Sequence, residues 1–216
     1  MTSTERDAWA ADARARMVDT QLRARGIVDL RVLDAMGTVP REKFVPDALV
    51  WQAYDDCALP IGPGQTISQP FMVARSLEVA ALRPHDRVLE IGAGSGYQAA
   101  LLGRLCARVI GVELVEALAG SARQRIADLG LTNVEIVHGD GSRGWPSEAP
   151  YDAILVAAGA PRVPDALVAQ LAEDGRLVIP LGPPHLQTLT VLRKHGDQVE
   201  RTTHEACVFV PLLGDY

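Results

Sequence analysis

From Asp86 onward, short apolar runs alternate with segments of helical periodicity, and this alternation constrains the fold more than any other feature of the chain. Strands are expected at residues 87–91, 108–113, 134–138, 151–158 and 175–180, with helices at 97–105, 115–129 and 164–171. Such alternation is typical of parallel strands joined by right-handed helical crossovers. The sequence therefore predicts an α/β fold with a doubly wound sheet.

The two ends of the chain add to this α/β core. Beyond Gly182, apolar residues around 189–191 and 206–213 predict two more strands with a short link, and hence a hairpin at one edge of the sheet. Helical periodicity occurs at 11–26, 30–36 and 71–82, whereas the Pro- and Gly-rich residues 59–70 are expected to form a loop. Residues 1–83 are expected to pack on a core of residues 84–216, giving one compact domain.

Composition narrows the classes of partner. The chain has 216 residues, 48% of them hydrophobic and 22% charged, which is enough apolar material for a sizeable core. Its 21 basic and 27 acidic residues give a net charge of −6. Nucleic acids and anionic membranes require a basic surface, so neither is an expected partner. A monomer is the simplest expectation.

Cysteines, histidines and the N-terminal segment point to an intracellular protein without a metal. The three cysteines form no CxxC pair, and the five histidines lack the spacing of metal ligands. The first seventeen residues carry six charges and contain no apolar run typical of a signal peptide. We therefore expect reduced thiols, no metal site and a cytoplasmic location.

A glycine loop follows the first expected strand of the core. It reads Gly92-Ala93-Gly94-Ser95-Gly96 and precedes an expected helix. Ligands of open α/β sheets bind at the carboxyl ends of the strands, where glycines let a ligand approach the backbone closely. A tight turn without a ligand is the alternative interpretation of the glycines alone.

Three carboxylates favour a ligand over a simple turn. Glu90 precedes the first glycine, Glu113 ends the second expected strand, and Asp140 follows the third. All three are expected at the same edge of the sheet. A carboxylate after the second strand can accept both ribose hydroxyls, and one after the third can accept an adenine amino hydrogen. Together they predict an adenosine site.

The glycine spacing indicates which adenosine cofactor is bound. A dinucleotide site requires G-x-G-x-x-G to hold a pyrophosphate, but Tyr97 occupies the position of the last glycine. A phosphate-binding GK[ST] sequence is also absent from the chain. An acidic residue at the start of the loop, here Glu90, suits a cofactor that carries an ammonium group and no phosphate, and this favours S-adenosylmethionine.

The chain resembles the protein-L-isoaspartate O-methyltransferases from about Met17 to Leu213. Residues 59–72 are the most specific part of the resemblance, because the glycine loop is shared by many methyltransferases. The matching segments are Met17-Val18, Gln21-Leu22, Arg25-Gly26-Ile27, Val39-Pro40-Arg41-Glu42, Phe44-Val45-Pro46, Tyr54-Asp55-Asp56, Leu59-Pro60-Ile61-Gly62, Gly64-Gln65-Thr66-Ile67-Ser68-Gln69-Pro70, Leu89-Glu90-Ile91-Gly92, Gly96-Tyr97-Gln98-Ala99-Ala100, Gly139-Asp140-Gly141, Pro150-Tyr151-Asp152-Ala153-Ile154 and Phe209-Val210-Pro211-Leu212.

This resemblance implies a Rossmann-like S-adenosylmethionine-dependent methyltransferase fold with a mixed sheet. The implied reaction transfers a methyl group to the free carboxylate of L-isoaspartyl residues in damaged proteins and peptides, with S-adenosyl-L-homocysteine as product. Ser68 takes the place of the family's catalytic serine. The implied cofactor contacts are Gln65, Thr66, Ile67, Ser68, Glu90, Gly92, Gly94, Ser95, Gly96, Glu113, Leu114, Asp140 and Gly141, and the implied substrate contacts are Ile61, Thr66, Ser68, Val210, Pro211 and Leu212.

Several alternatives stay open at this point. By position alone, Ser68 is equally suited to cap the helix expected near Phe71. The alternative enzyme is a peptide-tailoring aspartyl O-methyltransferase that acts on a dedicated partner peptide. A silent adenosine-binding module and a dinucleotide-dependent oxidoreductase belong to other classes. The chain also departs from the family in the stiff loop at residues 182–187, with Pro183 and Pro184, and in its first sixteen residues, which are expected to extend the first helix into solvent.

Overall fold

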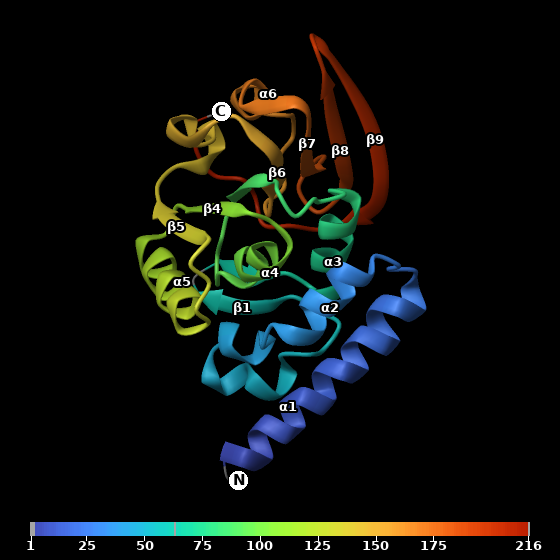
Figure 1. The fold of residues 1–216 in the computed structure, drawn as a ribbon, viewed down its shortest axis with the longest axis vertical. Helices are drawn as coiled ribbons and strands as arrows, with labels where there is room; N and C mark the ends of the chain where they lie inside the picture. Colours follow the sequence, from blue (N-terminus) through green and yellow to red (C-terminus); the bar gives the residue numbers. More distant parts are fainter. Residues whose placement is uncertain (1–2, 63, 216) are drawn as a thin grey trace.

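The computed structural model describes residues 3–62 and 64–215, and a seven-stranded sheet runs through its centre (Figure 1). The strand order is β5-β4-β3-β6-β7-β8-β9, in which β3 to β7 are mutually parallel and β8 and β9 are antiparallel to their neighbours. The bounds are β3 Arg87–Ile91, β4 Arg108–Glu113, β5 Val134–His138, β6 Tyr151–Val156, β7 Leu171–Leu181, β8 Gln187–His195 and β9 Gln198–Cys207. The expected mixed α/β sheet with a C-terminal hairpin is therefore confirmed.

The crossover helices cover the parallel part of the sheet. They are α4 Tyr97–Leu105, α5 Glu116–Asp128 and α6 Asp165–Ala169. Since β3 and β4 are covered on both faces, they consist almost entirely of buried residues. The residues expected for β3, α4, β4 and β5 agree with the observed bounds, whereas α6 is shorter than expected because Leu171 already belongs to β7.

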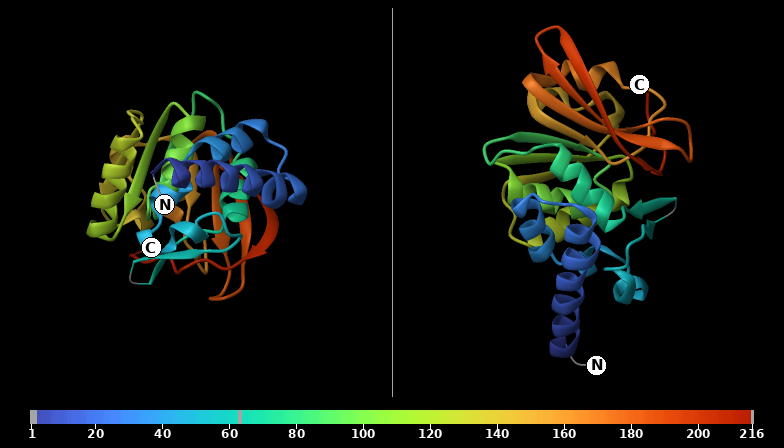
Figure 2. Two further views of the ribbon diagram at one scale, coloured as in Figure 1. Left: turned by 90° about the horizontal axis from the view of Figure 1, so that it is seen from below. Right: turned by 90° about the vertical axis from the view of Figure 1, so that its right-hand side faces the viewer.

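The N-terminal segment forms a helical layer against one end of the sheet. It contains α1 Ser3–Met17, the short helical segments Val18–Leu22 and Arg23–Arg25, α2 Leu30–Thr38, the 3₁₀ turns Arg41–Phe44 and Asp47–Gln52, and α3 Pro70–Val79. One continuous apolar core joins this layer to the sheet. Figure 2 shows α1 and the β8–β9 hairpin at opposite ends of the molecule. Among the described residues, no helix combines the length and apolar character needed to cross a bilayer.

Two expectations about irregular segments are wrong. Residues 59–70 are not simply a loop, because β1 Leu59–Gly62 and β2 Gln65–Ile67 pair as an antiparallel ribbon. The last strand is not 206–213 but β9 Gln198–Cys207. Most of β9 is polar and exposed at the edge of the sheet, so the apolar-run criterion overlooked it. The apolar residues 210–213 that follow β9 instead lie beside Gly159, just after the carboxyl end of β6, and line the cavity there.

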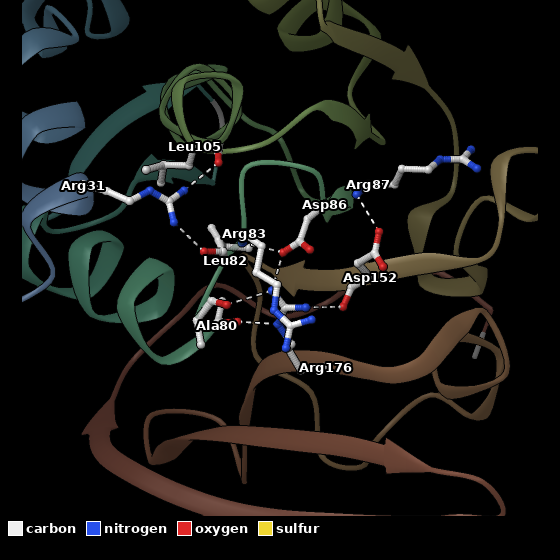
Figure 3. Close-up of polar contacts among 10 residues, drawn as sticks. Arg31, Ala80, Leu82, Arg83, Asp86, Arg87, Leu105, Asp152 and Arg176 are labelled. Atoms are coloured by element: carbon white, nitrogen blue, oxygen red, sulfur yellow. Dashed lines mark hydrogen bonds and ion pairs between the residues drawn. The ribbon is translucent and has the colours of Figure 1, made fainter.

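A buried ion pair closes the opposite, amino-terminal edge of the sheet. The guanidinium of Arg176 on β7 pairs with Asp86 and donates to the carbonyls of Ala80, Ala81 and Asp152 (Figure 3). Arg176 is 3% exposed and Asp86 1%. The pair thus joins the residues after α3 to the starts of β3 and β6 and to the middle of β7, on the side of the sheet away from the glycine loop.

Candidate active site

A cavity lies at the carboxyl ends of the central strands, under the β2–α3 turn and the C-terminal segment. Its wall is formed by the ends of β3 and β4, the glycine loop, and residues that follow β5 and β6. The lining residues are Gln65, Thr66, Ile67, Ser68, Val73, Glu90, Ile91, Gly92, Ala93, Gly94, Ser95, Tyr97, Gln98, Val112, Glu113, Leu114, Val115, Gly141, Ser142, Ala157, Ala158, Val210, Pro211, Leu212 and Leu213.

The glycine loop has a backbone that only glycine adopts readily. Gly92, Gly94 and Gly96 have φ angles of 83°, 54° and 87°, which lie in the left-handed region. At Gly96 a Cβ atom would also stand 3.1 Å from the Cβ of Ala122 on α5. The glycines therefore permit both the sharp strand-to-helix turn and the close packing of α5 behind it.

Glu113 ends β4 with its carboxylate held in place by the backbone. One oxygen accepts from the Gly94 N–H at 2.7 Å and the other from the Val115 N–H at 2.8 Å. Each carboxylate oxygen can accept a further hydrogen bond. The side chain is thus fixed against the glycine loop while retaining acceptor capacity toward the cavity that it lines.

Glu90 is the most unusual group in the cavity wall. It is fully buried, and neither carboxylate oxygen has a hydrogen-bond partner in the described part of the chain. Burial raises the pKa of this carboxyl well above its ordinary value; the Gln98 amide opposes the shift, and the charge of Glu113 adds to it. Unpaired buried carboxylates are costly, so Glu90 fits a ligand that brings a cationic donor into the cavity.

Ser68 lies on the turn between β2 and α3. It lines the cavity described above and also a second cavity, whose other walls are Ala58, Thr66, Gln69, Met72, Ala157, Ala206, Cys207, Val208, Phe209 and Val210. Gln69 occupies the N-cap position of α3, and Pro70 is the first helical residue. The interpretation of Ser68 as the helix cap is therefore wrong, and its position between two cavities suits contact with two ligands.

The segment after β9 lines both cavities, with Val208 to Val210 on the second cavity and Val210 to Leu213 on the first. Its path is fixed by Gly159, whose N–H donates to the Val210 carbonyl and whose carbonyl accepts from Leu212, both at 2.8 Å. The Gln187 side chain accepts from the Phe209 N–H at 2.8 Å and donates to the Pro183 carbonyl at 3.1 Å. The loop at 182–187 thus supports the segment that carries Val210, Pro211 and Leu212.

Three residues expected at the site are not among those that line the cavity. Gly96 packs behind the loop on α5, and the Ile61 side chain abuts Gly94. Asp140 has both carboxylate oxygens engaged by the Ser142 and Asp215 N–H groups. Desolvation opposes a lower pKa at Asp140, but these hydrogen bonds lower it nevertheless.

Sequence reasoning missed part of the wall, including Val73, Tyr97, Gln98, Ser142, Ala157 and Ala158. Ala157 and Ala158 were expected in a strand, but β6 ends at Val156. The residues directly after a parallel strand are candidates for lining the cavity, because ligands bind at the carboxyl ends of such strands. Gly159 and Gln187 gave no such signal, since their partners are distant in sequence.

The sheet order, the glycine loop and the acidic residues around the cavity are those of an S-adenosylmethionine-dependent methyltransferase, the class that this fold and site define. The sequence model of the protein-L-isoaspartate(D-aspartate) O-methyltransferase family, PCMT, matches residues 13–216. The chain belongs to this family, as its sequence motifs indicated.

Relatives and solved structures agree with this assignment. A protein-L-isoaspartate O-methyltransferase of Methylorubrum extorquens is 58% identical over 204 residues, with 94% of this chain and 89% of the relative covered. The corresponding protein of Koribacter versatilis is 55% identical over 202 residues, with 94% and 91% covered. A Plasmodium falciparum structure described as a PCMT in complex with S-adenosyl-L-homocysteine has a TM-score of 0.80 and 29% identity, with 93% and 98% covered.

A further solved structure, described as a protein-L-isoaspartate O-methyltransferase, has a TM-score of 0.85 and 30% identity. The match covers 93% of this chain and 66% of that chain. The expected family, fold and cofactor, S-adenosylmethionine, are thereby confirmed.

Proposed function

We propose that this chain repairs proteins by methylating the free carboxylate of L-isoaspartyl residues, with Ser68 as the residue that orients this carboxylate. The proposal depends on the position of Ser68, which lines both the first cavity, beside the glycine loop, and the second cavity. The cofactor belongs in the first of these and the substrate peptide in the second. Family membership supports the choice of substrate.

The residues of the first cavity suit S-adenosylmethionine. Glu90, with two unpaired oxygens, would accept from the cofactor ammonium group, and Glu113 would accept from the ribose hydroxyls. Residues 65–68, Ser95, Leu114 and Gly141, which line the same cavity, would enclose the cofactor. When bound, S-adenosylmethionine supplies a methyl group that is activated by its attachment to a sulfonium.

Methyl transfer to a carboxylate needs orientation and no general base. A carboxyl group with a pKa of about 4 is ionised at neutral pH, so no proton has to be removed from it. Holding the reacting groups in line contributes about 7–11 kcal/mol at most. The Ser68 hydroxyl would donate to the substrate carboxylate and fix its direction. Val210, which lines both cavities, would hold the peptide beside Ser68, on a segment fixed by Gly159. Pro211 and Leu212 follow on the same segment and line the first cavity alone, so they would reach only the part of the substrate that enters it.

We also propose that the protein works in the cytoplasm as a monomer, with residues 1–83 and 84–216 as parts of one domain. The shared apolar core supports the single domain, and the free thiols of Cys57, Cys106 and Cys207 are compatible with a reducing compartment. Repair is favoured over modification of a dedicated partner peptide, because the relatives are named for isoaspartate.

Matched peptides test the proposed substrate. Two peptides of the same sequence, one with an isoaspartyl residue and one with a normal aspartyl residue, are assayed for methyl transfer from labelled S-adenosylmethionine. We expect kcat/KM for the isoaspartyl peptide to exceed that for its aspartyl twin by more than about a hundredfold, a difference of about 2.7 kcal/mol in transition-state binding. Equal rates on both peptides would contradict the proposal.

A further inference from the structure

Arg41 is a completely buried arginine that pairs with no carboxylate in the described part of the chain. Its Nε donates to the Ala53 carbonyl at 2.6 Å and its Nη2 to the Ser68 carbonyl at 2.8 Å. The remaining nitrogen, Nη1, is buried without any hydrogen-bond partner among the described residues. Buried charges are normally paired, so this cation calls for an explanation.

Arg176, the other buried arginine, is an example of a buried cation with a structural role and a paired carboxylate. Arg176 also donates to backbone carbonyls, but its charge is balanced by the buried carboxylate of Asp86 (Figure 3). Arg176 lies at the amino-terminal edge of the sheet, away from the cavities. The two arginines therefore share burial and carbonyl contacts and differ in charge compensation and in their distance from the site.

In the part of the chain that the structure describes, neither a paired carboxylate nor solvent neutralises the positive charge of Arg41 near the site. The adjacent carboxylate, Glu42, is engaged by Arg14 and by the Tyr54 hydroxyl. Burial lowers the pKa of Arg41, but a guanidinium stays protonated at neutral pH. Because few mobile charges or waters surround a buried group, its field is weakly screened.

Arg41 also connects the two parts of the site. Its guanidinium lies 4.9 Å from the ring centroid of Tyr97, the first residue of α4 after the glycine loop. Through the Ser68 carbonyl it contacts the turn that carries the proposed orienting hydroxyl. One side chain thus holds the β2–α3 turn against the helix that begins at the cofactor loop.

We propose that Arg41 is a positioning and specificity-determining residue: it fixes the Ser68 turn through its carbonyl, and its uncompensated charge favours an ionised carboxylate beside Ser68. This inference rests on the proposed function. It explains why a cation without a countercharge is retained behind the site, because the substrate carboxylate supplies the missing negative charge. With a neutral side chain at position 41, the turn that carries Ser68 would be held less firmly, and the protein would no longer prefer a substrate with an ionised carboxylate.

The preference for charge can be measured separately from turnover. Dissociation constants are determined, with S-adenosyl-L-homocysteine bound, for an isoaspartyl peptide and for the same peptide with an isoasparaginyl residue, in which the carboxylate becomes a carboxamide. We expect the wild-type protein to prefer the charged peptide by about tenfold, and to keep this preference in 0.5 M NaCl, because the charge of Arg41 is buried.

Variants assign this preference to Arg41. The affinity ratio is the dissociation constant of the isoasparaginyl peptide divided by that of the isoaspartyl peptide. In Arg41→Met this ratio should fall to within about twofold of unity, and kcat should decrease. Arg41→Lys should retain most of the ratio because it keeps the charge. Arg176→Met is the matched control: its melting temperature should fall, but the ratio should not change. All values are referred to folded protein, counted by its S-adenosyl-L-homocysteine binding sites.

Three results would overturn the inference. They are an unchanged ratio in Arg41→Met, an equal loss of the ratio in Arg176→Met, and a wild-type ratio below about twofold. The last of these decides the question even where the neutral variants do not fold. Absence of methyl transfer by the wild-type protein would contradict the proposed function, while the binding ratio would still decide the role of Arg41.

Discussion

Ser68 is the residue on which the proposed mechanism depends most directly. Because Gln69 holds the N-cap position of α3, loss of the Ser68 hydroxyl should leave the helix intact. We expect Ser68→Ala to lower kcat and kcat/KM together, by roughly tenfold to a hundredfold, as for a hydrogen bond made to a charged group in the transition state. The affinity for S-adenosyl-L-homocysteine and the melting temperature should change little.

Steady-state kinetics, calorimetry and thermal unfolding of the same Ser68→Ala preparation provide this comparison. A conventional cap lost on substitution by alanine costs about 1 kcal/mol of stability. A variant that is destabilised by this amount and turns over at the wild-type rate would therefore contradict the orienting role.

The raised pKa of Glu90 predicts that ligand binding changes the number of bound protons. Burial raises the pKa of its carboxyl, so above the unfolded value of about 4.3 the folded protein holds a proton that the unfolded chain has lost. Its contribution to stability is therefore lost as the pH rises from that value toward the raised pKa. A cationic group of the ligand would stabilise the ionised carboxylate, so binding of S-adenosyl-L-homocysteine should release protons.

Proton release is measured by calorimetry in two buffers of different ionisation enthalpy. The observed binding enthalpy should depend on the buffer for the wild-type protein and much less for Glu90→Gln. Without ligand, the Gln variant should gain more stability relative to wild type at pH 8 than at pH 5. Buffer-independent enthalpies for the wild-type protein would show that Glu90 does not change protonation on binding.

At the scale of elements, burial explains which parts of the fold were predictable. The strands β3 and β4 and the helix α4 were predicted at their observed bounds, because central parallel strands are continuous apolar runs and the intervening helix has its own period. The edge strand β5 was also predicted at its observed bounds, because Val134 and Ile136 are apolar and buried. The edge strand β9 was misplaced because its residues are mostly exposed and polar. The β1–β2 ribbon was missed because Pro and Gly in residues 59–64 are typical of loops.

The site was predictable to the extent that its residues are local in sequence. The glycine loop, Glu90 and Glu113 follow strands that the apolar pattern identifies, so their meeting could be derived from topology. The place of Ser68 came from the family resemblance. Arg41 reaches the Ser68 carbonyl and Gln187 the Phe209 N–H, each more than twenty residues away, and no local pattern records such contacts.

At the scale of the whole molecule, the first helix divides into a solvent-exposed beginning and a part that supports the core. Residues 4–8 are exposed, and the ion pair between Arg6 and Asp47 is long, at 3.8 Å, and exposed. From Trp9 onward the helix packs: Trp9 lies 4.5 Å from the ring of Trp51, and Ala10 is buried. Exposed ion pairs contribute about 0–1 kcal/mol, so only the second part should matter for stability.

Two truncations test this division. Removal of residues 1–8 should leave kcat and the melting temperature nearly unchanged. Removal of residues 1–16 also removes Arg14, which donates to the Tyr54 hydroxyl at 2.8 Å and pairs with Glu42 at 3.2 Å. A loss of about 2–3 kcal/mol should lower the melting temperature by roughly 4–12 °C in a chain of this size.

Both truncated proteins, when folded, should keep the wild-type affinity for S-adenosyl-L-homocysteine. The reason is that no residue of α1 lines the cavity beside the glycine loop. The longer truncation should nevertheless slow methyl transfer. Arg14 is the cation that pairs with Glu42, and without it the charge of the Glu42 carboxylate, then bound only by the Tyr54 hydroxyl, would reduce the positive potential of the neighbouring Arg41. Wild-type kcat and peptide affinity in folded protein lacking residues 1–16 would show that α1 acts on stability alone.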